Sequence, residues 1–113
     1  MPTRYYLSLP NPDAARAAGA FAFRSQGGEA IAAELQDALR GDGLFERWRA
    51  TQEDPDAVDP ALGAVDPAAV VRGAQHDLHI ELVATTALPS AILKHRLRLL
   101  AGQSWQLRDV TAA

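Results

Sequence analysis

The side chains in this sequence that are best suited to binding a ligand are arginines, which supply ten of the eleven basic residues. A guanidinium group presents several N–H donors in one plane and can bind a carboxylate or a phosphate in a bidentate manner. In "AFRSQGGEA", Arg24 precedes two glycines and an expected helix, so an anion there would also lie near free backbone N–H groups. The segment lacks the Gly-Lys-Ser/Thr ending of a P-loop, and a glycine-rich turn that leads into a helix is the simpler interpretation.

A second arginine, Arg96, lies in "ILKHRLRLLAG", which has the pattern of an amphipathic helix. At about 100° per residue, Arg96 falls inside the apolar arc of this helix. A buried guanidinium without partners is very costly, so three environments are open to it. Its methylenes could line the core while the head group reaches the rim, it could pair with a carboxylate such as that of Asp109, or it could face a ligand or a second subunit. The first two make Arg96 structural, and that is the favoured interpretation.

Other chemistries find no support in the residue pattern. His76 and His79 flank Asp77, but residues three apart in one strand point to opposite faces, so their imidazoles are not expected to converge. The acidic stretch 53–66 departs from a calcium-binding loop at three positions when it is counted from Asp54. The chain has no cysteine, and its serines lie in no nucleophile-elbow motif. We therefore predict no catalytic residues, no metal site and no cofactor.

Hydrophobic periodicity predicts the elements that position these side chains. Period-two alternation predicts strands near residues 3–9, 44–51, 77–86 and 104–110. A 3.6-residue period predicts helices at about 29–40 and 89–101. The resulting βαββαβ order is that of an α+β, ferredoxin-like two-layer sandwich, with a four-stranded antiparallel sheet and two main helices on one face. Residues 11–26 fit either a helix or a strand.

In this arrangement the predicted core includes large apolar side chains from both layers: Leu35, Leu78, Ile80, Leu82, Leu97 and Trp105. The opposite, open face of the sheet is expected to carry polar and aromatic residues, among them Arg4, Tyr6, Arg47, Arg49, His79, Glu81 and Arg108. Tyrosine and arginine are favoured at protein interfaces.

The length of 113 residues fits one α+β domain, residues 1–113. An acidic, Asp-Pro-rich excursion is expected at about 53–70, with aspartates that start short helical turns at the surface. No apolar run is long enough to span a bilayer, no signal peptide is recognisable, and we expect a cytoplasmic, bacterial-type protein.

These features favour a non-enzymatic interaction or homo-oligomerisation module that uses the open sheet face, with self-association as the expected partnership. The alternative is a small-molecule anion-binding protein or a small enzyme that uses arginines near the 24–30 turn or on the sheet face. The candidate binding residues are Arg24, Arg47, Arg49, Tyr6, His79 and Arg96. Nucleic-acid binding is disfavoured because the aromatic pattern of RNA-recognition domains is missing.

Overall fold

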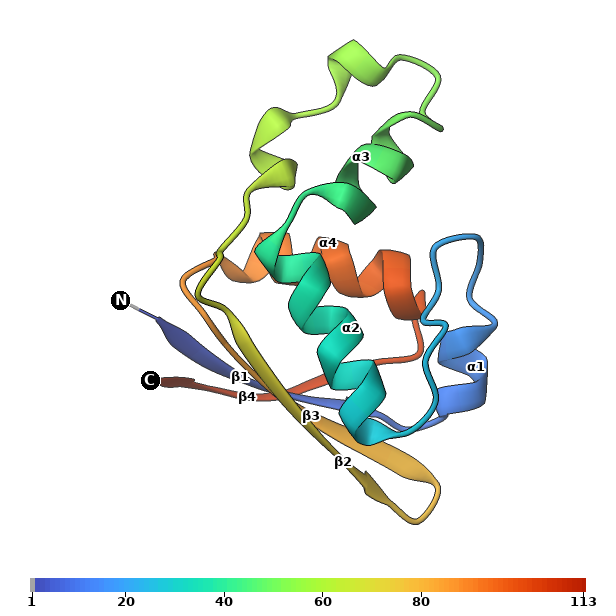
Figure 1. The fold of residues 1–113 in the computed structure, drawn as a ribbon, viewed down its shortest axis with the longest axis vertical. Coiled ribbons are helices and arrows are strands. Elements are labelled where there is room, and N and C mark those ends of the chain that lie inside the picture. Colours follow the sequence, from blue (N-terminus) through green and yellow to red (C-terminus); the bar gives the residue numbers. More distant parts are fainter. Residues whose placement is uncertain (1) are drawn as a thin grey trace.

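The computed structural model describes residues 2–113 as a small α+β domain with a four-stranded antiparallel sheet and four α-helices (Figure 1). The strands are β1 (Thr3–Leu9), β2 (Val70–His76), β3 (His79–Thr86) and β4 (Gln106–Ala112). The α-helices are α1 (Pro12–Arg16), α2 (Gly28–Arg40), α3 (Gly43–Arg49) and α4 (Ser90–Ala101). Two short 3-10 turns, Pro55–Ala57 and Pro60–Gly63, follow α3.

The strands lie in the order β2-β3-β1-β4, and each neighbouring pair is antiparallel. Helices α2 and α4 lie across one face of this sheet (Figure 1), and the inward side chains of β1 and β3 are buried beneath them. Within residues 2–113, no helix covers the opposite face (Figure 1). This division into a covered and an open face follows from the alternation of apolar and polar residues along β1 and β3.

The structure confirms the two main helices, α2 and α4, and three of the four strands, β1, β3 and β4, that the periodicity of the sequence predicts. Gly41 follows the last residue of α2 and Gly102 follows the last residue of α4, and Gly102 has the positive φ, 61°, that is common for a glycine after a helix C-terminus. In the ambiguous segment 11–26, Asn11 accepts a hydrogen bond from the Ala14 N–H and starts α1, with Pro12 in its first turn.

The strand predicted at residues 44–51 is wrong, because these residues form most of α3 and the turn after it. Leu44 and Phe45 are buried, and Trp48, one turn later, is half-buried against the imidazole of His95. The spacing of these three residues gives a short helix one apolar side, and a stretch this short fits a period of two almost as well. The second strand is instead β2, at residues 70–76.

The strand predicted at residues 77–86 begins two residues later in the structure, at His79, because Asp77 and Leu78 form the turn of the β2–β3 hairpin. Asp77 adopts a φ of 53°, a left-handed conformation that aspartate tolerates better than most residues. Leu78 is therefore 85% exposed at the tip of the hairpin, and its predicted place in the core is wrong. Of the other predicted core residues, Leu35, Ile80, Leu82 and Leu97 are buried, and Trp105 packs partly buried against the core.

Helix α2 approaches β2 so closely that only glycine fits at two positions. A Cβ atom on Gly73 would lie 2.3 Å from the carbonyl oxygen of Gly28, and one on Gly28 would lie 2.6 Å from the Ala74 backbone. This contact fixes the N-terminal end of α2, and with it the loop that carries Arg24.

Candidate functional site

The open sheet face carries two of the predicted binding residues, Tyr6 on β1 and His79 on β3, which lie two outward-facing rows apart along the strands. The strand register places Tyr6 beside Val83 on one side and Asp109 on the other. Arg72 of β2 lies next to Val83 in the same row. Arg72 was not predicted from the sequence because β2 was not expected, although the inward Val71 before it indicates its outward direction.

Arg47 and Arg49 do not lie on this face, which corrects the expected composition of the surface. Both belong to α3, which follows α2 in the helical layer. Arg49 donates to the Pro55 carbonyl over 2.9 Å and lies 3.5 Å from both the Glu46 and the Asp56 carboxylates. Arg49 thus holds the chain after α3 against that helix.

The two histidines of the β2–β3 hairpin lie together, contrary to the expectation from a single strand. The turn pairs His76 with His79, and their rings stack with centroids 5.6 Å apart. Each Nε2 lies within 3.5 Å of a Glu81 carboxylate oxygen. Within residues 2–113, no group of three or more His, Cys, Asp or Glu side chains is arranged so that it could hold a metal ion.

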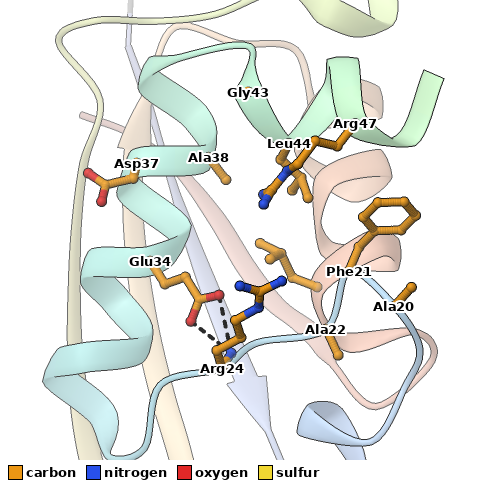
Figure 2. A pocket seen from close by; sticks show the side chains of 11 residues that line it. Ala20, Phe21, Ala22, Arg24, Glu34, Asp37, Ala38, Gly43, Leu44 and Arg47 are labelled. Carbon is orange, nitrogen blue, oxygen red and sulfur yellow. Dashed lines mark hydrogen bonds between the residues drawn. The ribbon is translucent and has the colours of Figure 1, made fainter. Parts of the chain in front are cut away.

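Arg24 and Arg47, which are 23 positions apart in the sequence, line the same cleft. It has a volume of about 380 Å³ and lies between α2, α3, α4 and the loop before Arg24. Figure 2 shows the guanidinium groups of both arginines directed into this space, whereas the Asp37 carboxylate points away from it. The remaining wall is largely apolar, with contributions from Phe21, Leu44 and Leu100.

Glu34 also lines this cleft, but its carboxylate is committed to the backbone. It accepts hydrogen bonds from the N–H groups of Arg24, at 3.0 and 3.2 Å, and of Ser25, at 3.0 Å (Figure 2). These bonds fix the loop that presents Arg24. No sequence signal identifies Glu34 for this role, because the contact bridges ten residues in the chain.

Arg96 is fully buried, with 0% exposure, and its environment differs from both structural alternatives derived from the sequence. Its Nη2 donates to the carbonyls of Leu62, at 3.0 Å, and Ala64, at 2.7 Å, while Nη1 donates to that of Ala38, at 3.3 Å. The head group does not reach the rim, and the proposed partner Asp109 lies exposed on β4.

A buried cation is tolerated here because it meets the negative end of a helix. Ala38 lies in the last turn of α2, where carbonyl groups lack intrahelical partners and carry partial negative charge. Burial lowers the pKa of the Arg96 guanidinium, and the charge of Asp42 opposes this shift. Nε has no hydrogen-bond partner within the described chain. Arg96 therefore joins α4 to the C-terminus of α2 and to the excursion.

Asp66 holds the C-terminal part of the excursion to the domain, although its sequence context predicted only an acidic surface loop. Its carboxylate accepts hydrogen bonds from the Ala87 N–H at 2.9 Å, the Thr86 hydroxyl at 2.8 Å and the Ala68 N–H at 3.0 Å. These bonds, the one from Ala87 foremost, lower the pKa of Asp66. The Asp66 N–H donates to the Leu39 carbonyl at 2.8 Å, which satisfies another terminal carbonyl of α2.

Comparison of the chain with models of known protein families, with curated proteins and with solved structures gave no match. Across residues 2–113, none of the helices combines the length and apolar character required to cross a bilayer. Two surfaces of the described residues are candidates for binding a partner or a ligand: the open sheet face and the Arg24–Arg47 cleft.

Proposed function

We propose that this chain is a non-enzymatic interaction module, located in the cytoplasm, that self-associates through its open sheet face on a ferredoxin-like (βαββαβ) scaffold. The scaffold assignment is supported by the order β1-α2-β2-β3-α4-β4 of the main elements. It is also supported by the strand order β2-β3-β1-β4. In this order β3 lies between β1 and β2, which are connected through α2, and β1 lies between β3 and β4, which are connected through α4. The helix α3 and the excursion are then additions between α2 and β2.

One row of side chains across the open face carries the proposal. In register order it reads Arg72 on β2, Val83 on β3, Tyr6 on β1 and Asp109 on β4. The row therefore has a cation at one edge of the sheet, an anion at the other and two apolar groups between them. With strands about 4.8 Å apart, the two charges stand roughly 14 Å from each other.

This row is complementary to itself under a two-fold rotation, the commonest symmetry of homo-oligomers. Consider an axis that lies between two facing sheets, runs parallel to the strands and passes between β3 and β1. Rotation about it places β2 of one copy over β4 of the other. Arg72 then faces Asp109 of the second copy, and Val83 faces Tyr6, each contact occurring twice. Aligned sheets pack with strands within about 30° of each other, so these pairs near the axis stay within reach.

The neighbouring rows are compatible with the same rotation. Arg4 of one copy faces the hydroxyl-bearing Thr85 of the other, and Glu81 faces Ser8. No two like charges are opposed in these three rows. The apolar content of the face is small, so charge pairs contribute a large share of the contact, and association should weaken as ionic strength rises.

The test is an exchange of charges between two variants, with mass measured by sedimentation equilibrium. In Arg72→Asp both edge positions are acidic, and in Asp109→Arg both are basic. Each variant alone should therefore remain monomeric, because like charges face each other twice. An equimolar mixture of the two should form a one-to-one dimer, since each acidic position then faces a basic one.

The wild type is expected to dimerise, and Arg98→Asp is the matched control because Arg98 lies exposed on α4, away from the sheet face. That variant should dimerise as the wild type does. A wild type that stays monomeric at high concentration contradicts the proposal. So does a mixture of the two variants that associates no better than either variant alone.

A further inference from the structure

The Arg24–Arg47 cleft lies in the helical layer, so whatever it binds is independent of association through the open sheet face. Its volume of about 380 Å³ falls within the range of about 300–1,000 Å³ typical of small-molecule sites. Its lining comes from four segments: the loop at residues 20–24, α2, α3 and the end of α4. The Glu34 hydrogen bonds and the close contact between Gly28 and Gly73 hold two of these segments in place.

The guanidinium groups of Arg24 and Arg47 have unused donors. Within residues 2–113, the hydrogen bonds made by arginine side chains belong to five other arginines: Arg16, Arg40, Arg49, Arg96 and Arg108. Each guanidinium carries five N–H groups in a planar fork that matches an oxyanion. Two such forks directed into one cleft (Figure 2) can bind one carboxylate or phosphate group from two sides.

The other walls restrict the kind of anion. Phe21, Leu44 and Leu100 offer apolar surface beside the two arginines, which favours a ligand with a compact hydrophobic substituent. Glu34 places a carboxylate along the α2 side, and Asp37 places a second one next to the cleft but directed away from it; the charge of the two disfavours an extended polyanion such as RNA. Glu34 is bonded to the backbone and the Asp37 carboxylate points away from the cleft (Figure 2), so neither of these described carboxylates is placed to act as a general base inside it, and the chemistry of the cleft is that of binding.

We propose that the Arg24–Arg47 cleft binds a small organic acid, a carboxylate or phosphate monoanion or dianion, that bears an aromatic or branched aliphatic group. The acid group lies between the two guanidinium groups, and the apolar group contacts Phe21 and Leu44. The affinity depends on both parts of the ligand.

The experiment uses calorimetric titration of the full chain with phenyl phosphate and phenylacetate at low ionic strength, followed by amide chemical-shift mapping. Both acids should bind, and inorganic phosphate and the neutral benzyl alcohol should each bind more weakly than either acid. Arg24→Ala and Arg47→Ala should each weaken binding by about 10-fold or more, since each removes charged hydrogen bonds. The shifts should map to residues 20–24, α2 and α3.

Arg98→Ala is the matched control, because it removes the same charge from an exposed position outside the cleft. It should change the affinity by less than about twofold. Melting temperatures of these three variants and of the Arg24→Ala/Arg47→Ala double variant verify that all four fold. Two results overturn the proposal: binding by the wild type that is no tighter than by an Arg24→Ala/Arg47→Ala double variant, or shifts that map to another surface. Neither result bears on association through the sheet face.

Discussion

Two regions next to the C-terminal half of α2 contain arginines in opposite situations. The first region is the anchor of the excursion, where Arg96 and Asp66 hold that segment to the domain. There Arg96 is buried and donates three hydrogen bonds to main-chain carbonyls. In the cleft, Arg24 and Arg47 are exposed, and their guanidinium groups bond to no other described residue. Ala38 contributes to both regions, its carbonyl to Arg96 and its side chain to the cleft. The comparison indicates that burial alone does not mark an arginine as functional, and that unused donors in a cleft are the more informative feature.

If the contacts of Arg96 hold the excursion in place, replacing Arg96 should lower the stability more than any change to Asp66, Arg24 or Arg47. Arg96→Ala leaves three carbonyls without their donor and opens a cavity between α2, α4 and the excursion. The free energy of unfolding should fall by about 3–5 kcal/mol. Arg96→Met, which retains much of the volume, should cost less but still about 1–3 kcal/mol, because the carbonyls remain unpaired. Urea denaturation measures both values. Wild-type stability in Arg96→Met would show that packing, and not hydrogen bonding, explains the buried arginine.

Replacing Asp66, the carboxylate of the anchor, should lower the free energy of unfolding by less than Arg96→Ala does, and the loss should depend on pH. Asp66→Asn removes one acceptor and turns an N–H donor towards backbone N–H groups, so we expect a loss of about 1–3 kcal/mol at neutral pH. Because the folded pKa of Asp66 is lower than its unfolded value near 3.8, the stabilisation is fully present above pH 3.8. It is lost as the pH falls through the folded pKa.

Urea denaturation of the wild type and Asp66→Asn between pH 2 and pH 7 tests this dependence, with the pH range set by the shifted carboxylate. The difference in stability between the two proteins should shrink at the acidic end. A difference that stays constant over the whole range would mean that the ionised carboxylate of Asp66 is not the stabilising group.

Both regions show what the sequence could and could not predict. The long periodic segments predicted α2, α4, β1 and most of β3 and β4, because their apolar faces repeat over several turns or alternations. The seven-residue α3 was mistaken for a strand because so short a segment fits both periods. Strand β2 escaped prediction because it is an edge strand of which only Val71 is buried, so its alternation is weak.

The candidate site was less predictable than the fold. Arg24, Arg47 and Arg96 were identified individually, but their roles depend on contacts between distant segments. The carbonyls that bind Arg96 come from α2 and from the excursion, and main-chain acceptors leave no trace in a sequence. The acidic composition of the excursion predicted only a surface segment, whereas Asp66 and the carbonyls of Leu62 and Ala64 hold it to the domain.

Removing both cleft arginines should have the smallest effect on stability, and it tests directly whether the two regions differ. An Arg24→Ala/Arg47→Ala double variant removes two cations whose guanidinium groups form no hydrogen bond within the described chain. Their removal leaves no backbone carbonyl without a donor, in contrast to Arg96→Ala. The Glu34 hydrogen bonds to the loop persist, because they involve the backbone N–H of Arg24 and not its side chain. The free energy of unfolding should therefore change by no more than about 0.5 kcal/mol, the usual range for surface substitutions. Urea denaturation in a ligand-free buffer gives this value. A loss comparable to that of Arg96→Ala would place the cleft arginines in the structural class and remove the distinction between the two regions.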